Sequence, residues 1–323
     1  MKITRTLLAA VATALAPIAL AQDYPARPVT LVVPVAAGGA VDGVGRTFAE
    51  EIGRRLGQSF VVENRVGAGG TLGAQAVARA QPDGYTLLFT HAAPIVHAPF
   101  VMQKGPYDGR RDFVFVSQVG AGSLLLGINA SLPVSSVKEF VAWGRMNRGK
   151  VSFGDFGVGS NGHLIGAYLS FANDLGAAHV SYKGEAPMVQ DIAAGTIPWG
   201  IGTIGGFAAQ IASGRVRPLA VLGARRLPAY PNVPTMAEEG FPDPEYFAQV
   251  GIYLLAPAGT PPAILARLEK AAREAGESAV MKARMQTYGL EAMGTASEAA
   301  RAAFDAALPI AEKLVKVSGA RAD

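Results

Sequence analysis

The strongest constraint on the fold is a repeated alternation of short apolar runs with segments of helical spacing. Residues 29–35, VTLVVPV, form a continuous apolar run, as expected of a strand that is covered on both faces. Residues 44–57 then carry an apolar side chain at every fourth position from Val44 to Leu56, which is the spacing of one helix face. Two more strand-like runs follow at 59–65 and 85–90, separated by a glycine-rich loop and a helical segment. Repeats of strand, helix and strand predict a parallel sheet with right-handed crossovers.

The pattern changes near residue 113, where two strands are predicted in direct succession. A second series of helices and strands follows, then one more strand near residues 248–255 and a largely helical C-terminal part. We therefore expect an α/β fold of two lobes, each a mixed sheet flanked by helices. Lobe 1 is predicted to hold residues 22–122 and 247–323, and lobe 2 residues 123–246. Ligands of such sheets bind at the carboxyl ends of the strands, which places the site in a cleft between the lobes that closes by a hinge.

The first 21 residues have the features of a secretory signal peptide. Lys2 and Arg5 form a positive segment, residues 6–20 are largely apolar, and Ala19-Leu20-Ala21 fits the small-x-small cleavage rule. The apolar run of about 15 residues is shorter than the roughly 20 that span a bilayer, so a retained membrane anchor is the weaker alternative. We expect cleavage near Ala21 and an exported, soluble protein.

Composition and motifs exclude several classes of function. The net charge of +4 is small and the charged residues are scattered, so no nucleic acid partner is expected. The chain has no cysteine, which removes disulfides, thiol catalysis and cysteine-based zinc sites. Its four histidines lack the spacing of a zinc hydrolase, and neither a G-x-S-x-G elbow nor a P-loop occurs. Nothing here predicts an enzyme, a metal site or a cofactor.

Two glycine-rich loops are the best candidates for a binding site. Residues 36–42 and residues 157–162 each lie between a predicted strand and a predicted helix, one in each series. A helix N-terminus presents unpaired N–H groups and a partial positive charge, and glycine lets a ligand approach the backbone closely. If the lobes face each other, the two loops could oppose each other and hold a carboxylate without lysine or arginine.

The second loop also allows a different interpretation. Gly157-x-Gly159-x-x-Gly162 is followed after the next predicted strand by Glu185, which is the dinucleotide fingerprint in outline. Two points count against dinucleotide binding. The fingerprint normally lies in the first βαβ unit of its domain, and Asp155 and Phe156 make the turn between strand and helix longer. The alternative function is therefore an exported α/β oxidoreductase that binds a dinucleotide at Gly157–Gly162. A third possibility is that these glycines only form a tight turn and bind nothing.

Four motifs carry a resemblance that covers nearly all of the chain after the signal peptide. They are V-x-P-x-x-x-G-G-x-x-D at 32–42, E-N-R-x-G-A-G-G at 63–70, P-D-G-Y-T-L at 82–87 and Y-K-G at 182–184. In this combination the chain resembles the Bug-type periplasmic solute receptors of tripartite tricarboxylate transporters. The resemblance implies a two-lobe periplasmic binding protein fold of the type II kind, a periplasmic location and a small organic acid as ligand. It also implies membrane permease subunits as partners, no catalytic step and no cofactor, and we expect a monomer.

The resemblance further implies that two loops hold the carboxylate of the ligand. The first matches residues 35–42, from Val35 to Asp42, where N–H groups around Ala37, Gly38 and Gly39 would act together with bridging water. Asp42 could instead be a cap or turn residue, and a role in ordering the loop is equally open.

The second implied loop matches residues 157–163. It begins at Gly157, and Ser160 and Asn161 are its expected side-chain partners, although both could simply cap a helix. Tyr182 of the Y-K-G motif is expected to line the second lobe.

Departures from the family pattern bear on the choice of ligand. Phe156 stands where the family often has a small or hydroxyl residue. Gly202 and Thr203 stand where many members have an acidic residue followed by asparagine. An aromatic ring and a missing acidic group favour an aromatic or other hydrophobic carboxylate. His91, just after the third strand, is expected at the rim of the cleft, and a surface loop histidine is the alternative.

Overall fold

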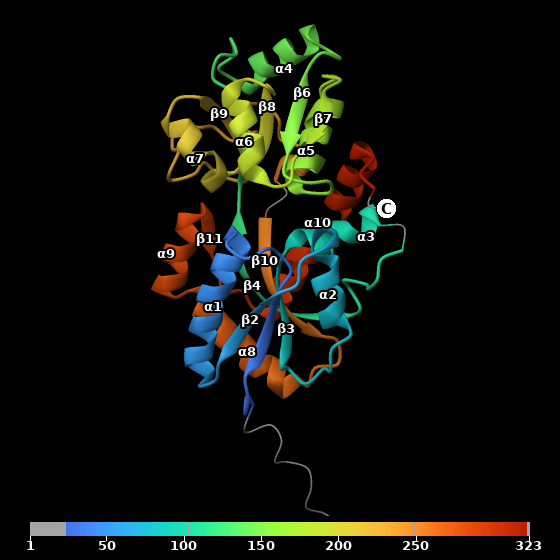
Figure 1. Ribbon diagram of the computed structural model, residues 1–323, viewed down its shortest axis with the longest axis vertical. Coiled ribbons are helices and arrows are strands. Elements are labelled where there is room, and N and C mark those ends of the chain that lie inside the picture. Colours follow the sequence, from blue (N-terminus) through green and yellow to red (C-terminus); the bar gives the residue numbers. More distant parts are fainter. Residues whose placement is uncertain (1–23, 103, 248–249, 322–323) are drawn as a thin grey trace, which may run out of the picture.

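The computed structural model of the protein describes residues 24–102, 104–247 and 250–321. The predicted signal peptide, residues 1–21, lies outside these residues. The strands form two sheets of six and five strands, which lie in two lobes, one above the other in Figure 1. This is the predicted α/β architecture of two mixed sheets flanked by helices. No helix of the described residues is both long and apolar enough to cross a membrane.

The lower lobe in Figure 1 is built on the six-stranded sheet, with the order β11-β4-β10-β3-β1-β2. Its parallel strands are β1 (Val29–Val33), β2 (Phe60–Asn64) and β3 (Thr86–His91). Its antiparallel strands are β4 (Phe113–Gly122), β10 (Val250–Pro257) and β11 (Leu290–Ala292). The helical elements of this part are η1 (Ala68–Gly70), α1 (Ala40–Leu56), α2 (Thr71–Ala78), η2 (Ala93–His97), α3 (Ala98–Val101), α8 (Pro262–Gly276) and α9 (Ala279–Thr287).

The amphipathic pattern of α1 shows why the sequence folds in this way. Val44, Phe48 and Ile52 are fully buried against the sheet, so the predicted apolar stripe faces the core. Gly57 ends the helix in the left-handed conformation, with φ 70°. This packing fixes the first turn of α1, and with it the preceding glycine loop, at the carboxyl end of β1.

The upper lobe is built on the five-stranded sheet, with the order β7-β6-β8-β5-β9. Its strands are β5 (Leu124–Asn129), β6 (Ser152–Asp155), β7 (Ala178–Ser181), β8 (Trp199–Thr203) and β9 (Val216–Leu222). Its helices are α4 (Val137–Met146), α5 (Asn161–Ala172), α6 (Glu185–Ala194) and α7 (Ile204–Ala212). A buried cluster around Trp199, Phe140 and Phe153 fills the space between α4 and the sheet.

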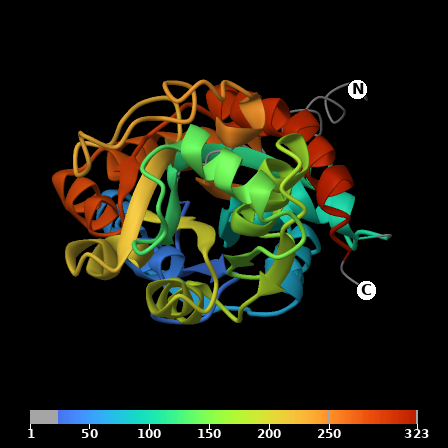
Figure 2. The same cartoon turned by 90° about the horizontal axis from the view of Figure 1, so that it is seen from above.

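The chain crosses between the lobes twice, and one helix packs in both cores. The first crossing joins β4 directly to β5, and the second leads from β9 through η3 (Pro244–Phe247) towards β10. The C-terminal helix α10 (Ser297–Ser318) buries Phe304 among the lower-lobe residues, whereas Leu314 packs in the upper-lobe core. Figure 2 shows this helix, in red, lying along one side of the molecule.

Three short elements, β11, η2 and α3, were not predicted from the sequence. β11 has three residues and only pairs with the edge of β4, so it is too short to give a readable alternation. The π-helical turn η2, together with α3, follows β3 where no helix was predicted, and Pro94 near its start obscures the pattern.

Candidate functional site

The first glycine loop leaves several backbone donors unpaired. Residues 36–39 are exposed, and Gly39 is the N-cap of α1 without any side-chain cap. Within the described part of the chain, the N–H groups of Ala37, Gly39 and Ala40 have no hydrogen-bond partner. Gly38 adopts φ +90°, which favours glycine, and its N–H is already used, since it donates to Asp42. The free donors therefore flank Gly38 and point to an anion site at the start of α1.

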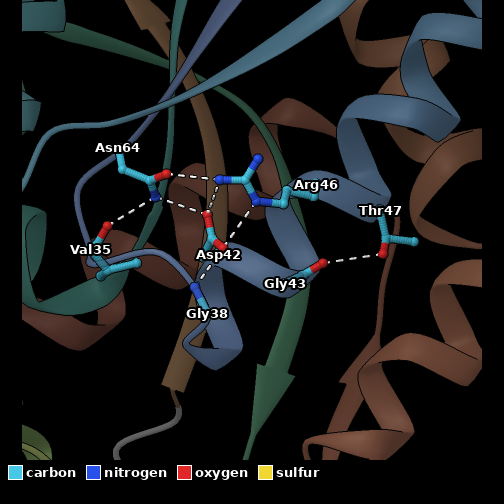
Figure 3. A network of polar contacts seen from close by, with 7 residues as sticks. All are labelled: Val35, Gly38, Asp42, Gly43, Arg46, Thr47 and Asn64. Carbon is cyan, nitrogen blue, oxygen red and sulfur yellow. Dashed lines mark hydrogen bonds and ion pairs between the residues drawn. The ribbon is translucent and has the colours of Figure 1, made fainter.

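A network of charged and polar side chains holds this loop in place (Figure 3). Asp42, which is 3% exposed, accepts hydrogen bonds from Gly38 N at 2.9 Å, from Arg46 Nε at 3.0 Å and from Asn64 Nδ2 at 2.8 Å. Asn64 Nδ2 also donates to the carbonyl oxygen of Val35 at 3.0 Å, which ties the beginning of the loop to β2. Asp42 thus orders the loop from inside and is not the N-cap of α1.

The ionisation of Asp42 follows from these contacts. Burial acts to raise the pKa of this carboxyl group, but the hydrogen bonds from Arg46, Gly38 and Asn64 outweigh burial and lower the pKa below its usual value. Asp42 is therefore a carboxylate at neutral pH, and the negative charge is satisfied inside the protein.

The second glycine loop, between β6 and α5, is shaped by left-handed backbone and a helix cap. Gly157 and Gly159 have φ +138° and +77°, and Gly157 N donates to Asp155 Oδ1 at 2.7 Å. Ser160 is the N-cap of α5, and its Oγ accepts from His163 N at 3.2 Å. The cap uses Ser160 as an acceptor and leaves its O–H hydrogen available to a ligand.

Asn161 is the most distinctive polar residue of the second loop. It is only 9% exposed, and its side chain has no hydrogen-bond partner among the residues that the structure describes. The atoms of this amide are not among the fully buried, unpaired polar atoms of the described residues, so the amide is accessible at the loop, where a ligand or water can bind it.

Two histidines that the sequence analysis did not select support the second loop. His163 Nδ1 accepts from Gly159 N at 3.1 Å, and His97 Nδ1 lies 3.0 Å from Gly159 O. Because a carbonyl oxygen only accepts, His97 carries its hydrogen on Nδ1. His97 lies on η2 of the lower lobe, so this contact crosses from one lobe to the other. No sequence signal links residues 62 positions apart, and only the proximity of His163 to the loop was readable.

A third group of predicted residues lies at the end of β8, and here the structure corrects an argument from the sequence. Thr203 caps α7 and donates through Oγ1 to Glu185 Oε2 at 2.7 Å, and its N–H donates to the same carboxylate. A Cβ atom at Gly202 would lie 2.5 Å from Glu185 Oε1. The space that glycine leaves is thus filled by an acidic group from α6, so Gly202 does not mean that the region lacks one.

The other predicted residues have partners of their own. The ring of Phe156 packs on Gly162, where a Cβ atom would approach it to 2.8 Å. Tyr182 donates its hydroxyl to Asp191 at 2.6 Å, and His91 Nδ1 accepts from Ala93 N at 3.2 Å. Burial lowers the pKa of His91 to about 4, helped by the nearby His97, so this ring is neutral.

The structure therefore brings the predicted residues together in groups rather than as one cluster of side chains. Val35, Ala37, Gly38, Gly39 and Asp42 form the first loop. Phe156, Gly157, Ser160 and Asn161 form the second, with Gly202 and Thr203 on the neighbouring strand β8. Both loops lie at carboxyl ends of parallel strands, at the ends of the sheets that the lobes turn towards each other in Figure 1. Among the described residues, no group of three or more side chains could hold a metal ion.

The dinucleotide alternative fits this geometry poorly. The fingerprint needs an acidic residue free to bind a ribose hydroxyl group. Glu185 instead accepts two hydrogen bonds from Thr203, on another strand, and is therefore occupied.

Comparison with known proteins agrees with the geometry. A family model described as tripartite tricarboxylate transporter family receptor matches residues 44–314. Protein BugT of Bordetella pertussis is 36% identical over 259 residues, which covers 80% of this chain and 79% of that protein.

Two solved structures are similar over nearly the whole chain. The periplasmic binding protein BugD is 32% identical with a TM-score of 0.78, covering 92% of this chain and 99% of its own. An R. palustris protein solved with adipate is also 32% identical, with a TM-score of 0.81 and the same coverage. These proteins are solute-binding receptors and not enzymes, and the chain belongs to their family, the Bug-type receptors of tripartite tricarboxylate transporters.

Proposed function

We propose that the protein binds a small organic carboxylate between its two glycine loops. The observation that carries this proposal is the set of unpaired donors at both loops. Ala37, Gly39 and Ala40 offer free N–H groups on the first loop, and Ser160 and Asn161 offer an O–H and an amide on the second. Two helix N-termini add favourable partial charge, so the carboxylate needs no arginine or lysine.

Two classes of acid compete as the ligand. Phe156 beside the second loop favours an aromatic acid, which can pack on the ring. Gly202 gives that class no support, because Glu185 of α6 fills the space beside this glycine. Adipate in a similar structure favours an aliphatic dicarboxylate, whose second carboxylate would have to lie away from Glu185 to avoid repulsion.

The wider role follows from the family. We propose a periplasmic location after cleavage near Ala21, and delivery of the ligand by a monomer to the permease subunits of a tripartite tricarboxylate transporter. The lobes would be residues 22–122 with 247–323 and residues 123–246. Closure would bend the two crossings, one between β4 and β5 and one before β10.

A thermal-shift screen of the purified protein tests the ligand class. The panel holds aliphatic dicarboxylates, tricarboxylates, benzoates and phthalates, with NAD and FAD as controls. A ligand that binds only the folded state raises the unfolding midpoint. A raised midpoint with organic acids alone supports the receptor function. Whether the effective acids are aromatic or aliphatic then decides between the two candidate ligand classes. A shift with a dinucleotide and with no acid would overturn the proposal.

A pair of substitutions at Gly39 tests the role of the backbone donors. Gly39 has φ −77°, which proline also adopts, so Gly39→Pro removes one N–H without demanding a new φ. Gly39→Ala keeps the N–H, and its Cβ would lie 3.7 Å from Ala36 O, an ordinary contact. We expect the proline variant to lose roughly tenfold in acid affinity, about the free energy of one charge-assisted hydrogen bond, and the alanine variant to lose little. Equal affinities in calorimetry would show that this N–H does not bind the acid.

A further inference from the structure

A cavity of about 230 Å³ lies beneath the C-terminal helix, and its described lining includes no residue of either glycine loop. Ala303, Ala307 and Leu314 of α10 form one wall, and η2, β4 and β10 form the other. Ala306, at the edge of the cavity, is exposed, so the cavity is open to solvent there. The alanines of α10 are too small to fill the space.

The cavity is apolar except for three buried side chains. His97, Gln118 and Tyr253 line it and are 5%, 4% and 4% exposed. The Tyr253 hydroxyl has no hydrogen-bond partner in the described residues. Among the described residues, the Gln118 side chain makes a single long hydrogen bond, from Nε2 to Gly120 O at 3.4 Å. The Nδ1–H of His97 is committed to Gly159, which leaves Nε2 as an acceptor that likewise lacks a partner in the described part of the chain.

The lining defines the chemistry of a ligand. No described residue that lines the cavity is an acid, a lysine or an arginine. Burial lowers the pKa of His97 to about 4, so its ring is neutral as well. A carboxylate would lose its hydration there without a counter-charge, so the occupant must be uncharged. A dry cavity of roughly 150 Å³ accommodates benzene, and this cavity is larger, so it has room for a substituted ring.

We propose that this cavity is a second binding site, for a small uncharged ring compound that carries a hydroxyl group, such as a phenol. The hydroxyl donates to His97 Nε2 and accepts from Tyr253 or Gln118, and the ring packs on the alanines of α10. Such a ligand stabilises the His97 tautomer that donates to Gly159, so occupancy of the cavity supports the conformation of the second glycine loop.

The test is calorimetric titration of the purified protein with phenol in a buffer without organic acids. We expect saturable binding of one phenol per chain. Ala307→Leu fills the cavity with a good helix former and should weaken binding roughly tenfold. Ala302→Leu, on the exposed face of the same helix, is the matched control and should bind as the wild type does. Absence of binding, or equal loss in both variants, would overturn the proposal.

Two more measurements separate this site from the glycine loops. Tyr253→Phe removes only the hydroxyl and should weaken phenol roughly fivefold; anisole, which cannot donate, should bind worse than phenol. Equal binding of anisole would overturn the hydrogen-bonding assignment. Gly39→Pro should leave phenol binding unchanged. If Gly39→Pro abolishes it and Ala307→Leu does not, phenol occupies the interlobe site, and the second site does not exist. If phenol binds as expected while no acid of the panel does, this site stands and the carboxylate receptor is the part that fails.

Discussion

The two glycine loops present similar free donors, yet their supports differ. The first loop is held by Asp42, Arg46 and Asn64, all from its own lobe, in a network of charge-assisted hydrogen bonds. The second is held by Asp155, which accepts from Gly157 N, and by histidine rings, one of which, His97, comes from the opposite lobe. The first loop can therefore keep its shape whatever the position of the lobes, whereas the second depends in part on their contact. We expect a ligand to bind first to the preorganised first loop. The second loop would then reach its binding conformation when the lobes close.

Acidic pH should weaken the histidine contacts of the second loop before the Asp42 network of the first. We expect this to give the largest change in the free energy of unfolding. Burial lowers the pKa of His97 and of His163 to about 4, against about 6.5 in the unfolded chain. Between these values the unfolded chain binds more protons, so the free energy of unfolding falls as pH falls from 6.5 to 4. A fully buried histidine contributes on the order of 3 kcal/mol to this loss. Asp42, with its lowered pKa, adds a further loss only below about pH 4.

Urea unfolding at pH 7.5, 6.5, 5.5 and 4.5 measures this dependence, and His97→Asn is the variant to compare. An asparagine amide can still donate to Gly159 but does not titrate, so its unfolding free energy should fall less steeply with pH. Parallel curves for the variant and the wild type would refute a role of His97 in the acid sensitivity.

Removal of Asp42 tests the support of the first loop. Asp42→Ala should lower the free energy of unfolding by roughly 2–3 kcal/mol and weaken acid binding, because Gly38 N and the Asn64 amide lose their acceptor. The matched control is Asp305→Ala, which breaks an Arg301–Asp305 pair of the same four-residue spacing on exposed helix surface. An exposed pair of this kind contributes about 0.5 kcal/mol or less. Similar losses in the two variants would mean that the Asp42 network is not special.

The smallest changes should occur at neighbouring residues of the second loop. Ser160→Ala removes a helix cap and should cost about 1 kcal/mol of unfolding free energy. Asn161→Ala removes a side chain without a partner in the described residues, so stability should change little while acid affinity drops several-fold. Denaturation measures the stability of both variants, and calorimetry measures their affinity for the acid. A larger loss of stability in Asn161→Ala than in Ser160→Ala would contradict the prediction.

The sequence predicted the local features of this molecule better than its long-range contacts. The fold class, the α1 stripe and both glycine loops depend on residues close together in the chain, and periodicity with glycine placement was enough to find them. The position of Glu185 against Gly202 and the bond from His97 to Gly159 join separate elements, and no local pattern encodes them. The inference from Gly202 to a missing acidic group failed for this reason, since it considered one position without its neighbour in space.

The C-terminal helix has a consequence for how the chain becomes a protein. Phe304 and Leu308 complete the packing of one lobe, and Leu314 and Val315 complete that of the other. Ribosomes deliver the N-terminal part first, so both cores lack these side chains until α10 has been made. We therefore expect the two lobes to complete their cores together, once α10 has emerged from the ribosome and docked.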